Sequence, residues 1–228
     1  MALYIDSALL DDVERICDVY SVAGVTTNPS LLLAAVERGQ RLDDMQVLRR
    51  LLSAVAGHVF MQPVGTSSEE LFNAGLRYAS VDPTRVVLKL PMSRPGLQAS
   101  KRLRERHVRF AFTAVMTPSQ AYAGASAGAE WVIPYMGRLR SAGIDACARI
   151  SAIRATLAES SRSTAILAAS IKSCADLVEA TASGARDITL VPDVFDTLLD
   201  DSLTQAALTR FDADWASMQS LLRGDDAR

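Results

Sequence analysis

Eight short apolar runs recur along the chain, and each is followed by a stretch in which apolar and charged residues recur at helical spacing. Runs such as 86–88 and 165–168 are continuous rather than alternating, which is typical of parallel strands covered on both faces. Parallel strands need helical crossovers, and eight such units can close a barrel. We therefore expect strands at residues 3–6, 22–26, 59–62, 86–90, 108–113, 131–135, 165–170 and 188–191.

The segments between these runs have the amphipathic pattern of crossover helices. Residues 43–56 place Leu48 and Leu51 on one stripe, and residues 68–80 do the same with Leu71. An open doubly wound sheet is the alternative, but it usually carries a glycine-rich phosphate turn after its first strand. The Ile-Asp-Ser-Ala sequence after the first run is not such a turn.

The length of 228 residues is close to that of one (β/α)8 barrel. The predicted fold class is therefore α/β: a (β/α)8 TIM barrel with an additional C-terminal helix. We expect a single barrel domain over residues 1–228, with residues 201–222 as the added helix.

Composition narrows the possible partners. The formal net charge of −2 provides no basic field for a nucleic acid backbone, and no apolar run approaches the ~20 residues of a membrane span. The N-terminus lacks the basic region of a secretion signal, so we expect a cytoplasmic protein. The three cysteines form no CxxC pair, and both histidines are isolated, so we expect no metal site. A small-molecule partner is the remaining expectation.

Polar residues stand at the ends of the apolar runs, where a core residue would otherwise be expected. The carboxyl ends of barrel strands surround the active-site mouth, so these residues form one candidate site. Any one of them alone could be a satisfied polar group at a strand end. The set consists of Asp6, Thr26, Asn28, Gln62, Lys89, Thr113, Tyr135 and Ser170.

Lys89 is the most informative member of this set, because only three of the 24 basic residues are lysines. A lysine surrounded by apolar residues loses hydration of its charged form, which favours the neutral, nucleophilic amine. Such an amine can attack a ketone. The alternative is a lysine that extends its ammonium group to solvent.

Two segments carry a family resemblance: Gly-Val-Thr-Thr-Asn-Pro-Ser at 24–30 and Val-Val-Leu-Lys-Leu-Pro at 86–91. They resemble the signature segments of the transaldolase family, and similarity continues through residues 4–6, 113–115, 134–138, 167–172 and 211–215. Within the family the chain is similar to the short bacterial branch that includes fructose-6-phosphate aldolase. This resemblance implies a (β/α)8 barrel that forms a Schiff base from its fourth strand.

The resemblance also implies roles for single residues. Lys89 matches the Schiff-base lysine, and Asp6 matches the acid that handles substrate hydroxyls and proton transfer. Thr113 matches the threonine that holds the catalytic water. Thr26 and Asn28 match substrate-contacting positions. The chemistry implied needs neither a metal nor an organic cofactor.

Arg138, Ser170 and Lys172 match the phosphate-binding set of the family. A guanidinium fork and an ammonium group near the late barrel loops suit a phosphate dianion. The alternative for Arg138 and Lys172 is ordinary surface charge.

Gln62 and Tyr135 separate the branches, since transaldolases of this family tend to carry glutamate and phenylalanine there. Glutamine cannot take a proton as a carboxylate does, so the tyrosine hydroxyl would move the proton through water. The resemblance thus implies a lyase that joins a dihydroxyacetone-like donor to an aldehyde such as glyceraldehyde 3-phosphate. The alternatives are a transaldolase, which transfers the dihydroxyacetone unit between sugar phosphates, and a sugar-phosphate-binding barrel without catalysis.

Two positions depart from the aldolase branch, which has small residues where this chain has Phe112 and Ile133. We expect both larger side chains to narrow the pocket.

The C-terminal helix carries an apolar stripe at intervals of three and four residues, formed by Leu208, Phe211, Trp215, Met218 and Leu222. The stripe could fold back on its own barrel. The resemblance instead implies that this helix docks on a neighbouring subunit, in a homo-oligomer that is a decamer of two pentamers.

Overall fold

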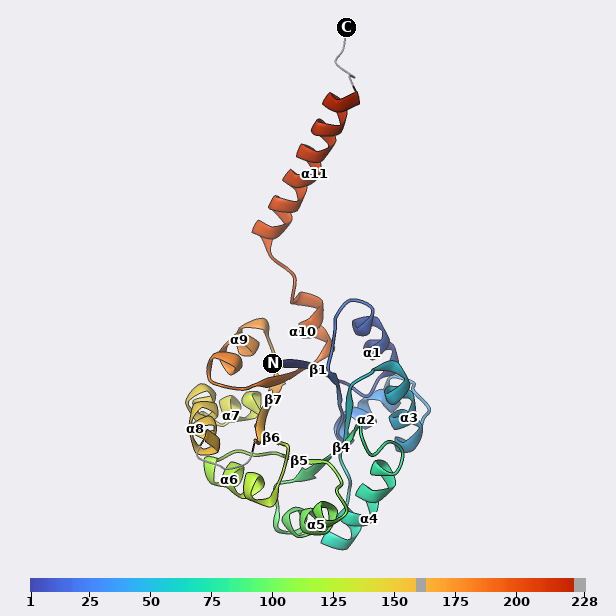
Figure 1. Ribbon diagram of the computed structural model, residues 1–228, viewed down its shortest axis with the longest axis vertical. Coiled ribbons are helices and arrows are strands. Elements are labelled where there is room, and N and C mark those ends of the chain that lie inside the picture. The colour runs from blue at the N-terminus through green and yellow to red at the C-terminus, as the bar shows by residue number, and fades with distance from the viewer. Residues whose placement is uncertain (159–162, 224–228) are drawn as a thin grey trace. The chain divides into compact units, whose positions relative to one another are not determined.

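The computed structural model describes residues 1–158 and 163–223, and its strands form one closed barrel in the order of the chain (Figure 1). Every neighbouring pair of strands is parallel, including β8 with β1. The strands are β1 (Ala2–Asp6), β2 (Gly24–Thr26), β3 (His58–Met61), β4 (Val86–Pro91), β5 (Phe110–Thr113), β6 (Trp131–Ile133), β7 (Ala165–Ile171) and β8 (Asp187–Leu190). The (β/α)8 barrel predicted from the sequence is confirmed.

The predicted strands are all present, with ends that differ by up to two residues. The sixth strand stops at Ile133 because Pro134 has no backbone N–H to donate to a neighbouring strand. Tyr135 pairs again with Ala169 through an isolated bridge, so the chain stays beside β7 up to this residue.

Helices surround the ring of strands (Figure 1). They are α1 (Leu10–Cys17), α2 (Pro29–Glu37), α3 (Asp44–Ala54), α4 (Ser68–Ala79), α5 (Arg94–Glu105), α6 (Pro118–Ala127), α7 (Met136–Ser141), α8 (Ala146–Ala158), α9 (Cys174–Ala182) and α10 (Pro192–Thr197). Leu48, Leu51 and Leu71, which the helical spacing placed on inner stripes, are all buried. Capping boxes at Asp43 and Ser67 define where α3 and α4 begin.

The strands direct alternate side chains to the two sides of the sheet, and this produces two separate apolar clusters. The larger cluster lies between the sheet and the surrounding helices. The smaller one fills the barrel interior and consists of Tyr4, Phe60, Val87, Ala111, Trp131, Ile133, Ala165, Leu167 and Ala169. Residues two positions further along these strands therefore also face the interior.

The expectation that Phe112 narrows the pocket is wrong. Ala111 and Thr113 occupy the inward positions of β5, so Phe112 faces the helices instead. It packs on α6, where a side chain at Gly124 would approach the Phe112 ring to 3.2 Å. Ile133 belongs to the interior cluster, so of these two residues only Ile133 faces the interior.

The chain divides into two units, Met1–Phe195 and Asp196–Arg228. The described part of the second unit contains α11 (Ser202–Arg223), so the helix expected at 201–222 is present, and none of its residues is buried. Its role in assembly stays a prediction. Among the described residues, no helix combines the length and the apolar character needed to span a membrane.

Candidate active site

The strand-end residues occupy one end of the barrel. Asp6, Thr26 and Thr113 are the last residues of β1, β2 and β5, and Lys89 lies two residues before the end of β4. Asp6, Lys89 and Thr113 each lie two positions beyond a residue of the interior cluster. Thr26 lies two positions beyond Gly24, which pairs with the interior residue Tyr4. All four side chains therefore point inward. The sequence thus assembles a polar layer above an apolar one.

Lys89 lies inside the barrel, with only 2% of its surface exposed. Val87, two residues earlier on β4, belongs to the interior cluster, which fixes the inward direction of the lysine side chain. The adjacent Leu88 and Leu90 pack outward against the helices. Lys89 is therefore not a surface lysine that extends its ammonium group into solvent.

Asp6 belongs to a chain of hydrogen bonds that crosses three strands. The Thr26 hydroxyl lies 2.6 Å from Asp6 Oδ1, to which it donates, and 2.7 Å from the Thr189 hydroxyl on β8. Sequence reasoning missed Thr189, although it stands as a lone hydroxyl in the apolar run 188–191. With Thr189, the eighth strand also contributes to the polar layer.

Thr113 and Tyr135 come together at the ends of β5 and β6. Their hydroxyl oxygens lie 2.6 Å apart. The guanidinium carbon of Arg138 lies 5.4 Å from the centre of the Tyr135 ring, within the range of a cation–π contact. Two predicted catalytic residues and one predicted phosphate ligand therefore adjoin each other.

Ser170 and α7 lie against each other. Strand pairing shifts register between Ala168 and Ile171, and Ser170 has a φ of 60°, a left-handed conformation that non-glycine residues seldom adopt. A Cβ atom on Gly137 would lie 2.8 Å from the Ser170 hydroxyl and 3.7 Å from Lys172 Cγ. Glycine at 137 thus allows the helix that carries Arg138 to approach Ser170 and Lys172.

The two other predicted residues are placed differently. Asn28 is the N-cap of α2, and its side-chain oxygen accepts a hydrogen bond of 3.0 Å from the Leu31 backbone N–H. Gln62 follows β3 directly, two residues after the inward-facing Phe60.

Comparison with known proteins identifies the family. The model described as transaldolase/fructose-6-phosphate aldolase matches residues 3–225. The chain belongs to this family. It is 35% identical over 215 residues to a "Probable transaldolase" of Symbiobacterium thermophilum, covering 94% of this chain and 97% of that protein. It is 34% identical over 219 residues to a "Probable transaldolase" of Brevibacillus brevis, covering 96% and 100%.

A protein described by another name shares this fold. A crystal structure described as a "putative phosphonomutase" from Burkholderia cenocepacia superposes with a TM-score of 0.62, covering 92% of each chain at 16% identity. At this identity the likeness reports the barrel architecture alone.

The opposite end of this transaldolase-family barrel holds a second polar cluster. The Trp131 indole N–H donates to Asp187 Oδ2 at 2.8 Å, and the Tyr4 hydroxyl lies 3.4 Å from His58 Nδ1. Burial and the charge of Asp187 raise the pKa of Tyr4 to about 12. Burial, followed by the charge of Arg109, lowers the pKa of His58. His58, Trp131 and Asp187 are the first residues of β3, β6 and β8, at the end of the barrel away from Lys89.

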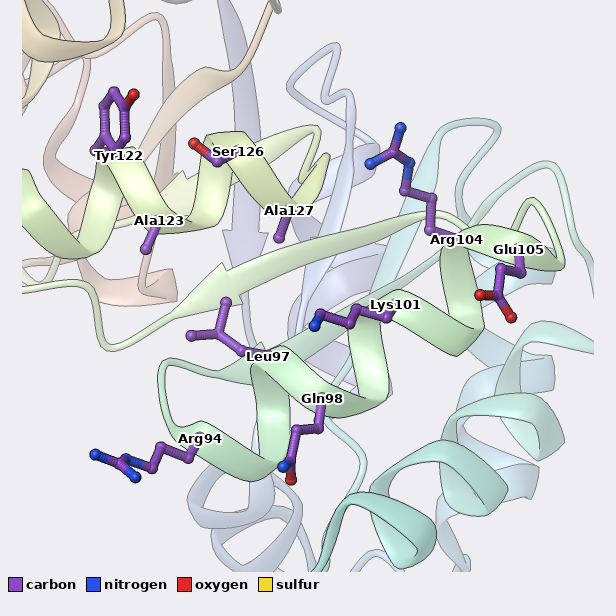
Figure 2. A pocket seen from close by; sticks show the side chains of 10 residues that line it. All are labelled: Arg94, Leu97, Gln98, Lys101, Arg104, Glu105, Tyr122, Ala123, Ser126 and Ala127. Carbon is purple, nitrogen blue, oxygen red and sulfur yellow. The ribbon is translucent and has the colours of Figure 1, made fainter.

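A groove of about 1060 Å³ lies between α5 and α6, on the outer side of this family barrel (Figure 2). Its lining includes the basic residues Arg94, Lys101 and Arg104 and the aromatic Tyr122. None of the strand-end residues lines it. Lys101 therefore belongs to a surface separate from the interior that contains Lys89.

Proposed function

We propose that this member of the transaldolase/fructose-6-phosphate aldolase family is a Schiff-base aldolase of the fructose-6-phosphate aldolase type. The burial of Lys89 inside the barrel carries this proposal, because an amine held away from water suits imine formation. The reaction class is a reversible aldol addition. The donor is a dihydroxyacetone-like ketone, and the acceptor is an aldehyde such as glyceraldehyde 3-phosphate.

In the cleavage direction, the neutral Lys89 amine adds to the C2 carbonyl of the ketose, and loss of water gives a protonated imine. A base removes the proton of the C4 hydroxyl, the C3–C4 bond breaks, and its electron pair moves toward the imine to form an enamine. The aldehyde leaves. Protonation of the enamine at C3 and hydrolysis of the imine then release dihydroxyacetone and regenerate the amine.

The Thr113–Tyr135 pair supplies a route for the protons. A water bound to these two hydroxyls can carry a proton between the substrate and Tyr135, since each hydroxyl can both donate and accept. Asp6, which accepts a hydrogen bond from Thr26, is suited to hold a substrate hydroxyl and share in proton transfer. Gln62 has no carboxylate, which favours the tyrosine as the acid and base.

The phosphate end of the substrate is assigned to Arg138, Ser170 and Lys172. The close approach of Gly137 to Ser170 and Lys172 supports this assignment, because it brings the helix that carries Arg138 against the segment that carries Ser170 and Lys172.

A transaldolase is the second candidate, and the names of the relatives, each a "Probable transaldolase", favour it. The same enamine would form in that enzyme. It would be discharged by attack on a second aldehyde instead of by protonation and hydrolysis. The two activities therefore differ in whether turnover needs an acceptor.

Borohydride reduction in the presence of fructose 6-phosphate tests the Schiff base. We expect a stable adduct that peptide mass mapping assigns to Lys89, and we expect Lys89→Met to abolish it while Lys101→Met retains it. An adduct on Lys101 or Lys172 would overturn the assignment. Release of glyceraldehyde 3-phosphate from fructose 6-phosphate alone then identifies an aldolase, whereas turnover only with added erythrose 4-phosphate identifies a transaldolase.

A further inference from the structure

Asp176, on α9, is a buried carboxylate outside the set of residues assigned to the reaction. Its side chain is only 7% exposed. It stands in the first turn of α9, behind the N-cap residue Ser173, whose hydroxyl accepts a 3.1 Å hydrogen bond from the Asp176 backbone N–H. A buried carboxylate needs compensating partners, and both of its oxygens have them.

One oxygen binds the backbone just after β7, next to two of the proposed phosphate ligands, Ser170 and Lys172. Asp176 Oδ2 accepts a hydrogen bond of 2.9 Å from the backbone N–H of Lys172. This N–H lies two residues after Ser170, whose left-handed backbone follows the shifted pairing of β7. Since such a conformation is unfavourable for serine, the surrounding contacts must maintain it, and this hydrogen bond is one of them.

The other oxygen holds α7. Asp176 Oδ1 accepts a hydrogen bond from Arg140, which stands two residues after Arg138. The same guanidinium also contacts Glu179, but the Glu179 side chain is 49% exposed and makes no hydrogen bond to the Lys172 backbone. Asp176 is thus bonded to both segments that carry the proposed phosphate ligands, whereas Glu179 is bonded to only one.

We propose that Asp176 is a positioning residue for substrate phosphate: it joins the end of β7 and the following Lys172 to α7 so that Arg138, Ser170 and Lys172 converge on one phosphoryl group. This role rests on the function proposed above. It acts through other residues, since both carboxylate oxygens bind protein groups. Removing its charge would leave Glu179 as the remaining carboxylate partner of Arg140 and would weaken the connection between α7 and the end of β7.

The test compares two acceptors that differ only in phosphate. In aldol addition of dihydroxyacetone, we expect Asp176→Asn to raise KM for glyceraldehyde 3-phosphate about tenfold, because a small misplacement of binding groups weakens their contacts. KM for unphosphorylated glyceraldehyde should stay within about twofold of wild type, because that acceptor lacks the group positioned by Asp176. Glu179→Gln is the matched control and should change neither KM. In an Arg138→Gln background, Asp176→Asn should raise KM for glyceraldehyde 3-phosphate little further, because both changes affect the same phosphate site.

Calorimetric titration with inorganic phosphate provides a readout that is independent of turnover. We expect binding to weaken about tenfold in Asp176→Asn and to be unchanged in Glu179→Gln. Two results would overturn the positioning role. One is an equal rise of KM for both acceptors, and the other is unchanged phosphate affinity in a folded Asp176→Asn protein. Failure of the proposed function would appear differently, as wild-type protein that forms no borohydride-trapped adduct at Lys89.

Discussion

The hydroxyl oxygens of Thr113 and Tyr135 lie 2.6 Å apart at the ends of β5 and β6. If Tyr135 is the main acid and base of the reaction, Tyr135→Phe should lower kcat for aldol cleavage by ~10² or more, because a positioned proton-transfer group contributes about that much. Steady-state release of glyceraldehyde 3-phosphate from fructose 6-phosphate measures the effect.

The matched control for this change is Tyr122→Phe, which removes the same hydroxyl from an exposed residue of α6. Its cleavage rate should equal that of wild type. Full activity in Tyr135→Phe would remove the main support for an aldolase that uses tyrosine as its acid and base.

Gln62→Glu should shift the balance from cleavage toward transfer. The new carboxylate, two residues beyond the inward-facing Phe60, can exchange protons where the amide cannot. We expect the ratio of transferase to lyase turnover, measured with and without erythrose 4-phosphate, to rise. Gln98→Glu introduces the same charge in the groove between α5 and α6 and should leave the ratio unchanged. A ratio that does not respond to Gln62→Glu would argue against a proton-transfer role at this position.

His58 should make the barrel less stable as the pH falls. Burial lowers its pKa from the ordinary value of 6.5, so around that value the folded protein binds fewer protons here than the unfolded chain. The stability that the neutral ring provides is present above pH 6.5 and is lost as the pH falls toward the lowered pKa. We expect His58→Gln to reduce the loss of melting temperature between about pH 7.5 and about pH 5.

The exposed His107 supplies the comparison for His58. It has a φ of 57°, a conformation that asparagine tolerates, so His107→Asn replaces the second histidine with little strain. This variant should keep the wild-type pH dependence of melting. The same dependence in His58→Gln would show that other groups determine the acid sensitivity.

The sequence predicted the barrel because its strands are buried on both sides and therefore appear as continuous apolar runs, as in 165–168. The site residues at the strand ends could be predicted for the same reason, because a polar residue such as Lys89 stands out at the end of an apolar run. Thr189 was missed because it lies within an apolar run and not at its end. Its place became clear only from the 2.7 Å contact with Thr26 on a strand distant in sequence.

The direction of a side chain was harder to predict than the element that carries it. Phe112 directly precedes Thr113 and Ile133 lies two residues before Tyr135, and Phe112 faces the helices whereas Ile133 faces the interior. A shift of one residue reverses the side, so the strand boundary must be known to that precision. The direction of the Ser170 side chain was equally hard to predict. The register shift in β7 interrupts the alternation of inward and outward side chains, and no local sequence pattern indicates that shift.

The apolar stripe of α11 is the basis of the last prediction. Leu208, Phe211, Trp215, Met218 and Leu222 are between 39% and 76% exposed, and an apolar face of this kind needs a partner. We propose that the stripe joins copies of the chain into a homo-oligomeric ring. Trp215 is the expected anchor, because aromatic side chains bury a large apolar area at one point and often dominate interface energetics.

Trp215→Asp, or deletion from Asp200 onward, should therefore convert a large ring into smaller species or aggregates. Light scattering coupled to size-exclusion chromatography gives the mass directly. Thr209→Asp places the same charge on the other side of α11 by helical periodicity and should leave the assembly intact. A wild-type mass near the 24.5 kDa of one chain would show instead that the stripe is covered within its own chain.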